Sequence, residues 1–364
     1  MLKDLVLCMI VKDEATIIAR AIRSVRAHIS AFAIVDTGSS DGTIERAREL
    51  LSGLPGAIAT RPWLDFSSNR NEALALARNF GTHALILDAD EELTLTSTAF
   101  PQLPNDIDLF WIGERSTKPA PSLSKPRILR LDSGYRFTGV IHESIAYDDR
   151  ARHADLSELG ILAHYDGARS QGSVREKYLS DASVLENALA SEPENSRYWY
   201  YLGMSYLAAG ESERAQAPFD RVLSTPSALP SELYDARMRL ATIARQNHRF
   251  DVAELHLREA SKLAPHRSDP LIVLAEIAFS RGEASISHAL ALRSLEIPVV
   301  NDGMFIDSEL QFPRRHLIFL QAAQAVGDLA RARQVVENVL RQPQISEQAR
   351  GVFLEWRARL ANPK

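Results

Sequence analysis

Short apolar runs alternate with amphipathic segments along the first hundred residues. The apolar runs cover 5–11, 32–37, 57–62 and 83–90, and apolar residues recur at helical spacing over 14–29, 43–52 and 69–80. Short continuous apolar runs are typical of strands buried in a parallel sheet, and the segments between them are long enough for crossover helices. The pattern therefore predicts a βαβ sheet with right-handed crossovers.

Four further strand-like segments follow, and they contain more glycine and proline. They cover 108–114, 126–131, 135–145 and 160–165. We expect them to extend the sheet and to cover the crevice at the carboxyl ends of its strands.

From residue 173 the pattern is almost wholly helical and contains an internal repeat. The first unit places the residues of the tetratricopeptide pattern at Trp199, Leu202, Gly203, Tyr206, Gly210, Ala215, Phe219 and Pro226. Ala241 and Ala275, at matching positions of the next two units, lie one 34-residue period apart. An insert at 296–316 precedes a fourth unit and is either a packing loop or part of a binding face. We predict an α/β domain over 1–172 and an all-α repeat domain over 173–364.

Composition narrows the class of protein. The 364 residues are enough for two domains with separate cores. The net charge of −5 argues against a nucleic-acid partner, which needs concentrated basic residues. The single cysteine, Cys8, lies in an apolar run and fits a buried thiol in a reducing compartment. That run is too short for a signal peptide or a membrane span, so we expect a cytoplasmic protein.

Polar clusters follow three of the predicted strands, at 12–14, 36–42 and 88–92. Because the carboxyl ends of parallel strands lie at one edge of a sheet, we expect these clusters to face one crevice.

Asp88 and Asp90 flank Ala89 in the third cluster, so an extended chain directs both carboxylates to the same side. Such a pair suits a hard cation, Mg²⁺ or Mn²⁺, that also binds phosphate oxygens. The alternative is a solvated acidic turn before a helix that starts near Thr94. The position of the pair after a buried strand favours the cation site.

In the second cluster, Asp36 ends a strand and is followed by a turn with Gly38 and Gly42. The Asp36 carboxylate could accept hydrogen bonds from a nucleobase, or the segment is only a loop and helix cap. The segment lacks the G-x-G-x-x-G fingerprint of dinucleotide-binding folds.

Four motifs, in this order and spacing, resemble family 2 glycosyltransferases, which have the nucleotide-sugar-binding fold called GT-A. They are MIVKDEATIIARAIRSV, AIVDTGSSDGT, SSNRNEALALA and LILDADEEL. Two later motifs, YRFTGVIHES and AHYDGARSQGSVREKYLSDASVLENAL, resemble the subgroup that fuses this domain to tetratricopeptide repeats. Some members of that subgroup glycosylate peptides, the bacteriocin S-glycosyltransferases among them.

The resemblance implies donor contacts at the strand ends. Val11 and Glu14 match positions that flank the base and ribose of a nucleotide sugar, and Asp36 matches the position that holds uracil. Thr37 replaces a second aspartate that many members have, a departure that affects the base contact.

The resemblance also assigns the charged centre of the site. Arg70 and Asn71 match an arginine–asparagine pair of the family, and Arg70 would contact the diphosphate or the sugar, unless it is an exposed arginine at a helix start. Asp88 would contact the ribose or the sugar, and Asp90 would bind the Mn²⁺ or Mg²⁺ that bridges the two phosphates.

An inverting transfer needs a base beside the acceptor nucleophile. Glu143 is the candidate base and His142 the second candidate, and a hydrogen-bonded structural corner is the alternative for this pair. His164 would be a further metal ligand or a diphosphate contact, or a structural histidine. Arg127 and Arg130 would clamp phosphate or project from an edge strand.

The leading hypothesis is a metal-dependent, inverting glycosyltransferase with a nucleotide-sugar donor, UDP-sugar being favoured. Repeat arrays form concave surfaces that bind peptides, so a peptide or protein acceptor held by the repeats is favoured over a glycan. One alternative is a non-catalytic repeat scaffold with a glycosyltransferase-like domain, and another is a transferase acting on a glycan or lipid-linked acceptor. The repeats would equally serve as a homodimer surface.

Overall fold

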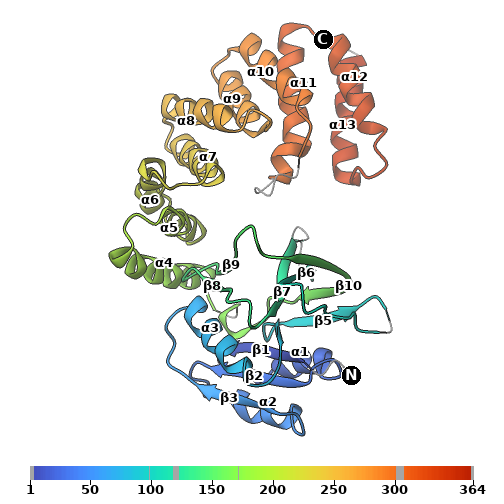
Figure 1. Cartoon of the computed structure of the whole chain (residues 1–364). Helices are drawn as coiled ribbons and strands as arrows, with labels where there is room; N and C mark the ends of the chain where they lie inside the picture. The colour runs from blue at the N-terminus through green and yellow to red at the C-terminus, as the bar shows by residue number, and fades with distance from the viewer. Residues whose placement is uncertain (1–3, 98, 118–122, 171, 301–306, 362–364) are drawn as a thin grey trace. The chain divides into compact units, whose positions relative to one another are not determined.

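The computed structural model describes residues 4–97, 99–117, 123–170, 172–300 and 307–361. The chain forms two compact units, which comprise residues 1–192 with 205–210, and residues 193–204 with 211–364. Helix α4 (Val174–Ser191) groups with the first unit, and α5 (Ser196–Ala208) is divided between the two. Figure 1 shows the strands of the first unit and the helices of the second.

Among the described residues, eight strands form the main sheet, in the order β3-β2-β1-β4-β7-β6-β10-β5. Their bounds are β1 Leu5–Val11, β2 Ala31–Asp36, β3 Gly56–Thr60, β4 His83–Ile86, β5 Glu91–Leu95, β6 Leu109–Ser116, β7 Leu123–Arg130 and β10 His153–Ala163. The first four strands run parallel, while β7 is antiparallel to β4 and β6, and β5 is antiparallel to β10. The predicted βαβ sheet is confirmed, and the later strands extend it as expected.

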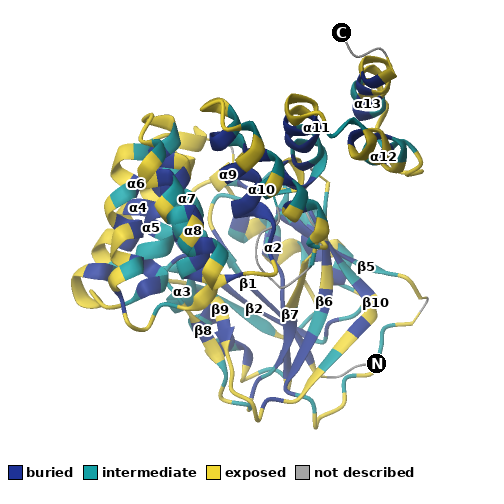
Figure 2. Ribbon diagram, turned by 90° about the horizontal axis from the view of Figure 1, so that it is seen from above, coloured by how far each residue is buried: buried dark blue, intermediate teal, exposed yellow. Residues whose placement is uncertain are grey.

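Helices cover both faces of the sheet because its strands are apolar on both sides. On one face, alternate residues of β1 pack with α1 (Ile18–Val25) and α2 (Thr43–Leu50). On the other face, the intervening residues, Cys8 among them, pack with α3 (Phe66–Ala77). Figure 2 shows the central strands as buried. The prediction that Cys8 is a buried thiol is confirmed, and burial raises its pKa to about 12 despite the opposing charge of Arg70.

Two local predictions are wrong. The chain forms strand β5, not a helix, at Thr94, because Leu93 of this segment packs into the core and its backbone pairs with β10. The segment 135–145 is not a single strand. It forms a hairpin of β8 (Arg136–Thr138) and β9 (Ser144–Ala146), with Gly139 at φ 96° beginning the turn.

The helices after α4 pair as the repeat pattern predicts. Their bounds are α5 Ser196–Ala208, α6 Ser212–Ser224, α7 Pro230–Gln246, α8 Phe250–Leu263, α9 Asp269–Ser280, α10 Ala284–Glu296, α11 Arg315–Val326, α12 Leu329–Leu340 and α13 Glu347–Ala361. Short helical turns occur at η1 (Ala168–Ser170) and η2 (Leu310–Arg314). Gly203 of α5 lies against the ring of Phe219 on α6, where a Cβ would approach within 2.7 Å. The small residue therefore allows the two helices to pack closely.

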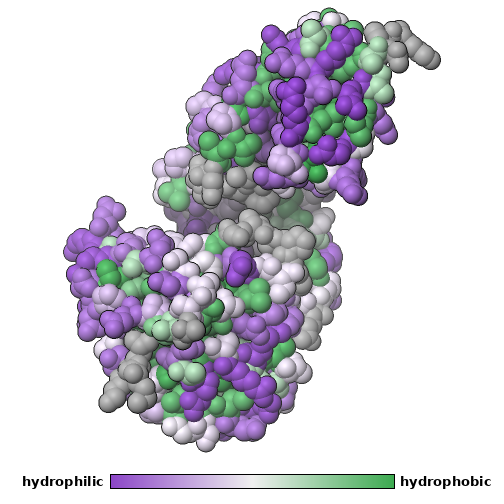
Figure 3. All heavy atoms as spheres, turned by 90° about the vertical axis from the view of Figure 1, so that its right-hand side faces the viewer, coloured by the Kyte–Doolittle hydropathy of each residue, from purple (hydrophilic) through white to green (hydrophobic). Residues whose placement is uncertain are grey.

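No helix in the described part of the chain is long and apolar enough to cross a membrane. On the face shown in Figure 3, apolar side chains form small groups among hydrophilic ones.

Candidate functional site

Hydrogen bonds join the loops that follow β1 and β2 at the carboxyl edge of the sheet. The amide of Asp13 donates to Ser39 Oγ (2.9 Å), and the amide of Ser40 donates to Asp13 Oδ1 (2.7 Å). The amide of Glu14 donates to Thr43 Oγ1 (2.7 Å). Two of the three predicted polar clusters therefore lie side by side.

Three of the four carboxylates in the third cluster are paired with arginines from other elements. The pairs are Asp88–Arg70 (2.8 Å), Glu91–Arg127 (2.6 Å) and Glu92–Arg20 (3.7 Å). Each guanidinium offsets part of the cost of holding a carboxylate at the end of a buried strand. Asp90 has no arginine or lysine partner among the described residues.

Arg70 lies between two carboxylates, Asp88 and Glu143. Its Nη2 donates to both oxygens of Asp88 (2.8 and 3.1 Å), and its Nε donates to Glu143 Oε1 (2.6 Å). Burial disfavours the ionised form of Asp88, but the charges of Arg70 and Arg127 and the hydrogen bond from Arg70 together outweigh burial and lower its pKa. Arg70 itself is only 8% exposed, so the alternative of an exposed arginine at a helix start is wrong.

Arg127 and Arg130 hold the fold together rather than facing a ligand. Buried Arg127 donates to Glu91 Oε1 and Glu114 Oε2, both at 2.6 Å, and Arg130 donates to Asp108 Oδ1 (2.6 Å). Strand β7 lies between β4 and β6. The expectation of an edge strand is therefore wrong, because a strand late in the sequence occupies the middle of the sheet.

Asp90 and Glu14 converge on one glycine. A Cβ at Gly167 would lie 3.2 Å from Glu14 Oε1 and 3.6 Å from Asp90 Oδ2. Burial and the neighbouring Asp88 raise the pKa of Asp90, although its own amide and that of Gly167 donate to it. Burial raises the pKa of Glu14 to about 7, against a hydrogen bond from the backbone, and the charge of Asp90 adds to the rise. The site thus holds two negative groups that its arginines do not neutralise.

This donor set fits a divalent cation that is shared with a substrate. Carboxylate oxygens are the ligands that Mg²⁺ and Mn²⁺ prefer, and a cation beside Asp90 would relieve the repulsion that raises its pKa. The described residues contain no group of three or more His, Cys, Asp and Glu side chains that could hold a metal. A cation bound by Asp90 would therefore need further ligands from substrate phosphates or water.

Of the other two predicted metal ligands, Asp88 has a protein partner, whereas the buried Nε2 atom of His164 makes no hydrogen bond among the described residues. Both oxygens of Asp88 face Arg70. The Nε2 atom of His164 lies 3.5 Å from Glu92 Oε2, and its amide donates to the carbonyl of Asp90 (3.0 Å). Asp90 and His164 are accordingly stronger metal-ligand candidates than Asp88.

Val11 and Asp36, the predicted donor contacts at the ends of β1 and β2, both form hydrogen bonds with backbone amides. The Asp36 carboxylate accepts hydrogen bonds from the amides of residues 38 and 39 (3.1 to 3.2 Å) and is 1% exposed. Val11 is buried, and its carbonyl accepts from the amide of Thr37 (2.9 Å). The Asp36 side chain is thus held by the turn that follows β2.

Asparagines on either side of the buried arginine fix helix α3. Asn71 exchanges two hydrogen bonds of 2.9 Å with the backbone of Phe137, so its amide ties the helix to the β8–β9 hairpin. Asn69, which sequence reasoning missed, is fully buried and bonds to the backbone of Leu64 and Pro62 (both 3.1 Å). Its place inside the SSNRN motif was the signal that could have indicated a role.

The two base candidates lie in the turn between β8 and β9. His142 is exposed and has φ 53°, a left-handed conformation. The side chain of Glu143 is 13% exposed, and Arg70 holds its Oε1. Its Oε2 accepts no hydrogen bond from the described residues. Glu143 therefore presents one restrained and one uncommitted oxygen next to Asp88.

Sequence reasoning named the motif that contains the segment after β10 but missed the partners of this segment. Arg20 donates to Asp166 through two hydrogen bonds (2.9 and 2.5 Å) across 146 positions, and the amide of Ala168 donates to Glu14 (3.1 Å). No short-range pattern reveals pairings over such separations. The glycine at 167, just beyond a strand end, was the only local hint.

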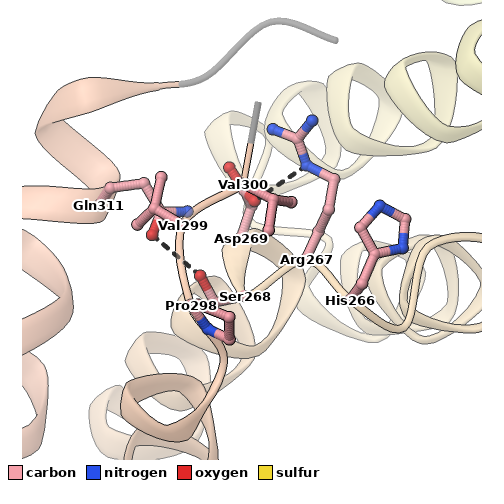
Figure 4. Close-up of a pocket in the computed structure, with 8 residues that line it drawn as sticks. All are labelled: His266, Arg267, Ser268, Asp269, Pro298, Val299, Val300 and Gln311. Carbon is pink, nitrogen blue, oxygen red and sulfur yellow. Dashed lines mark hydrogen bonds and ion pairs between the residues drawn. The ribbon is translucent and has the colours of Figure 1, made fainter. Parts of the chain in front are cut away.

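A small pocket in the second unit does not compete with this site. Residues at the start of α9 and near 300 line it, and Figure 4 shows Arg267 bonded to Asp269 and Ser268 bonded to Gln311. Its volume of about 10 Å³ has room for about one water molecule. The described part of the insert 296–316 thus packs against α9, while residues 301–306 lie outside the described structure.

Comparisons with known proteins match two separate parts of the chain. Residues 6–96 match the model of glycosyl transferase family 2, and residues 181–230 match a tetratricopeptide repeat model. A tetratricopeptide repeat-containing protein of Synechococcus elongatus is 27% identical over 311 residues, which are 79% of this chain and 74% of that protein. An uncharacterized glycosyltransferase of Rickettsia felis is 38% identical over 86 residues, 23% of this chain and 28% of that protein.

Two solved structures align with about half of this chain. MamA aligns with 54% of this chain and 98% of its own, at 15% identity and a TM-score of 0.37. A thermophilic tetratricopeptide repeat protein of Thermus thermophilus aligns with 50% of this chain and 91% of its own, at 16% identity and a TM-score of 0.33.

The family matches fall on the sheet that carries Asp90 and on the helices that follow it. The chain therefore carries a glycosyl transferase family 2 domain at its N-terminus and a tetratricopeptide repeat in its C-terminal half.

Proposed function

We propose that this protein is a metal-dependent, inverting glycosyltransferase that moves a sugar from a nucleotide-sugar donor, a UDP-sugar being favoured. The observation that carries the proposal is that the carboxylates after β4 are unequally paired with arginines. Three carboxylates have arginine partners, whereas Asp90 has none within the described part of the chain and lies beside Glu14 with its pKa raised. An unneutralised carboxylate in a family 2 domain is where a cation shared with the donor diphosphate would be held.

Asp90 would hold this cation, with Glu14 close by. When bound, Mn²⁺ or Mg²⁺ supplies Lewis-acid stabilisation of the charge on the departing nucleoside diphosphate. Arg70 keeps Asp88 ionised and restrained, so that its oxygens have one orientation when a donor arrives. The loops after β1 and β2 are already joined, so this side of the site requires little reorganisation.

The proton of the acceptor would pass to Glu143. Arg70 fixes Oε1 of this carboxylate, and Oε2 is left to accept the proton from an attacking acceptor atom. In Glu143→Gln the amide oxygen can still accept from Arg70, but the side chain can no longer take a proton. We expect donor binding to persist and the turnover rate to fall at least about 100-fold. An unchanged kcat in this variant would assign the base elsewhere, with His142 the next residue to substitute.

The acceptor is proposed to be a peptide or protein bound by the repeats. Tetratricopeptide arrays form extended surfaces that recognise polypeptides. A glycan or lipid-linked acceptor is the alternative on the acceptor side, and it predicts transfer that does not require the repeats.

One observation favours a second function, that of a non-catalytic scaffold. Arg70 forms ion pairs with both Asp88 and Glu143 within the protein itself, as expected if these residues only stabilise the domain. The two functions differ in nucleotide uptake, because a scaffold needs no donor.

Thermal stabilisation by ligand decides between the two. UDP-, GDP- and dTDP-sugars would each be added with and without MnCl₂, since a ligand that binds only the native state raises Tm by mass action. The proposal expects stabilisation by one nucleotide series, dependent on the metal. If none of the three nucleotide series changes Tm, the scaffold function is supported instead.

A further inference from the structure

The segment after β10 crosses the candidate site as a strap, which we define as residues 164–170. At its start, the amide of His164 donates to the carbonyl of Asp90 (3.0 Å). Further along, Arg20 of α1 donates to the carboxylate of Asp166 at 2.9 and 2.5 Å. The strap is therefore attached both to the acidic loop and to a helix on one face of the sheet.

Two backbone amides of the strap hold the unneutralised carboxylates. The amide of Ala168 donates to both oxygens of Glu14 (3.2 and 3.1 Å). The amide of Gly167 donates to the carboxylate of Asp90. Because a Cβ at Gly167 would lie 3.2 Å from Glu14 Oε1, the strap passes close to both side chains. The orientation of Glu14 and Asp90 thus depends on where the strap lies.

The next residue, Arg169, attaches the strap to two helices. Its guanidinium lies 4.5 Å from the ring centroid of Phe66 at the start of α3, a cation–π arrangement. It also donates to the carboxylate of Asp181 on α4. Asp181 is 5% exposed, so this ion pair is partly shielded from water on the carboxylate side. A single side chain therefore links the strap to elements before and after it in the sequence.

We propose that Arg169 is a positioning residue for donor binding, through the strap amides that orient Glu14 and Asp90. The effect of Arg169 on donor binding rests on the proposed function, whereas its attachment of the strap to α3 and α4 does not depend on that function. Arg169 adjoins Ala168 in the chain, so anchoring its side chain to α3 and α4 restrains the Ala168 amide. Without that anchor the two carboxylates lose the fixed orientation needed to meet a cation and a diphosphate.

Hydrogen exchange in the full-length protein without nucleotide tests the mechanical part. In Arg169→Ala, amides of the strap are expected to exchange roughly tenfold faster than in the wild type, because a charged hydrogen bond that holds them closed is lost. Asp181→Asn removes only the ion pair. Its strap amides are expected to exchange faster than in the wild type but more slowly than in Arg169→Ala. Arg169→Lys keeps the charge and should restore most of the protection.

The matched control is Arg150→Ala. Arg150 also pairs with an aspartate, Asp148, but its side chain is 89% exposed and the pair lies outside the strap. This variant should leave strap exchange unchanged. Equal strap exchange in Arg169→Ala and wild type would overturn the inference, whatever the protein binds.

Nucleotide affinity tests the consequence. The dissociation constant of UDP with MnCl₂ is expected to rise roughly 10- to 100-fold in Arg169→Ala, the usual effect of removing a residue that orients a ligand group. Arg169→Lys should recover most of the affinity, and kcat at saturating donor should change less than KM. Faster exchange with unchanged UDP affinity would mean that Arg169 is structural only, which contradicts the proposal.

The two proposals fail in different ways. If the wild type takes up none of UDP, GDP and dTDP with MnCl₂, the proposed function fails. The exchange comparison then decides by itself whether Arg169 holds the strap.

Discussion

At the scale of single residues, the carboxylates of the acidic cluster 88–92 differ in their effect on stability. Those paired with arginines stabilise the fold, whereas the charge of Asp90 destabilises it. Asp88 is paired with a buried guanidinium, whereas burial and the nearby charges of Asp88 and Asp166 raise the pKa of Asp90. Removing the charge of Asp90 should therefore not weaken the folded state, in contrast to breaking a buried pair.

We predict that Asp90→Asn folds with an unchanged or higher Tm in the absence of ligand, and loses the stabilisation by UDP and MnCl₂. The amide removes a repelled charge but is a poor ligand for a hard cation. Asp88→Asn is the comparison variant, expected to lower Tm because it leaves the charge of Arg70 partly unpaired. Undiminished metal-dependent stabilisation in Asp90→Asn would place the cation elsewhere.

Glu14 makes stability depend on pH. Its pKa rises from an ordinary value of 4.5 to about 7 in the folded protein, so between these values the folded state binds more protons than the unfolded state. Stability contributed by the protonated form is present below about pH 4.5 and is lost as pH rises to about 7. The Glu14→Gln variant has no carboxyl group at this position, so it does not lose this stability as pH rises. We expect its unfolding free energy, relative to wild type, to increase over that range by roughly 1 kcal/mol, a figure reduced for partial solvent exposure.

Urea unfolding at several pH values without added metal measures this difference. A constant difference between Glu14→Gln and wild type across the range would show that the carboxyl group titrates normally.

At the scale of elements, close packing of the first repeat depends on a missing side chain. A Cβ at Gly203 of α5 would lie 2.7 Å from the Phe219 ring, closer than real contacts allow. We predict that Gly203→Ala destabilises the second unit by about 1–3 kcal/mol through overpacking, although alanine favours a helix. Gly351→Ala on α13 is the matched control, because its Cβ would meet nothing within 4 Å. Alanine should stabilise there by about 0.5–1 kcal/mol, and urea unfolding compares the two.

The elements that sequence predicted best are those whose burial follows a simple period. Strand β1 and the other parallel strands are apolar on both faces, and helix pairs such as α5 and α6 repeat small and aromatic positions. The sequence pattern predicts one strand where the β8–β9 hairpin forms, because the turn is short and lies between strand-forming residues. Strand β7 could not be placed, since a run of apolar residues does not reveal which neighbours it will pair with.

The candidate site was predicted in composition but not in pairing. The motifs located Asp88, Asp90, Arg70 and Glu143. They did not show that Arg70 would bind both Asp88, 18 positions away, and Glu143, 73 positions away. The motif at the strap was noted, but the contacts of Arg169 were not predicted for the same reason, because they involve residues from two other helices. Charge and residue type are legible in a sequence, whereas long-range partners depend on the completed fold.

At the scale of the whole molecule, the repeat pattern and the contacts place the domain boundary differently. The sequence suggests a break at 172, where the helical pattern begins, whereas α4 groups with the sheet domain in the folded chain. Three residues of α4, Ala182, Leu185 and Leu189, are buried. Asp181 receives Arg169 from the strap, and Glu186 accepts a hydrogen bond from Tyr206.

We therefore predict that a fragment of residues 1–210 melts at a higher temperature than a fragment of residues 1–172. The shorter fragment loses α4, and each buried leucine contributes about 2 kcal/mol. It also leaves Arg169 without Asp181, so its affinity for UDP with MnCl₂ should fall relative to the longer fragment. Thermal unfolding and UDP titration of both fragments make the comparison, with the full-length chain as reference. Equal melting temperatures would mean that α4 belongs with the repeats, and the boundary at 172 would then stand.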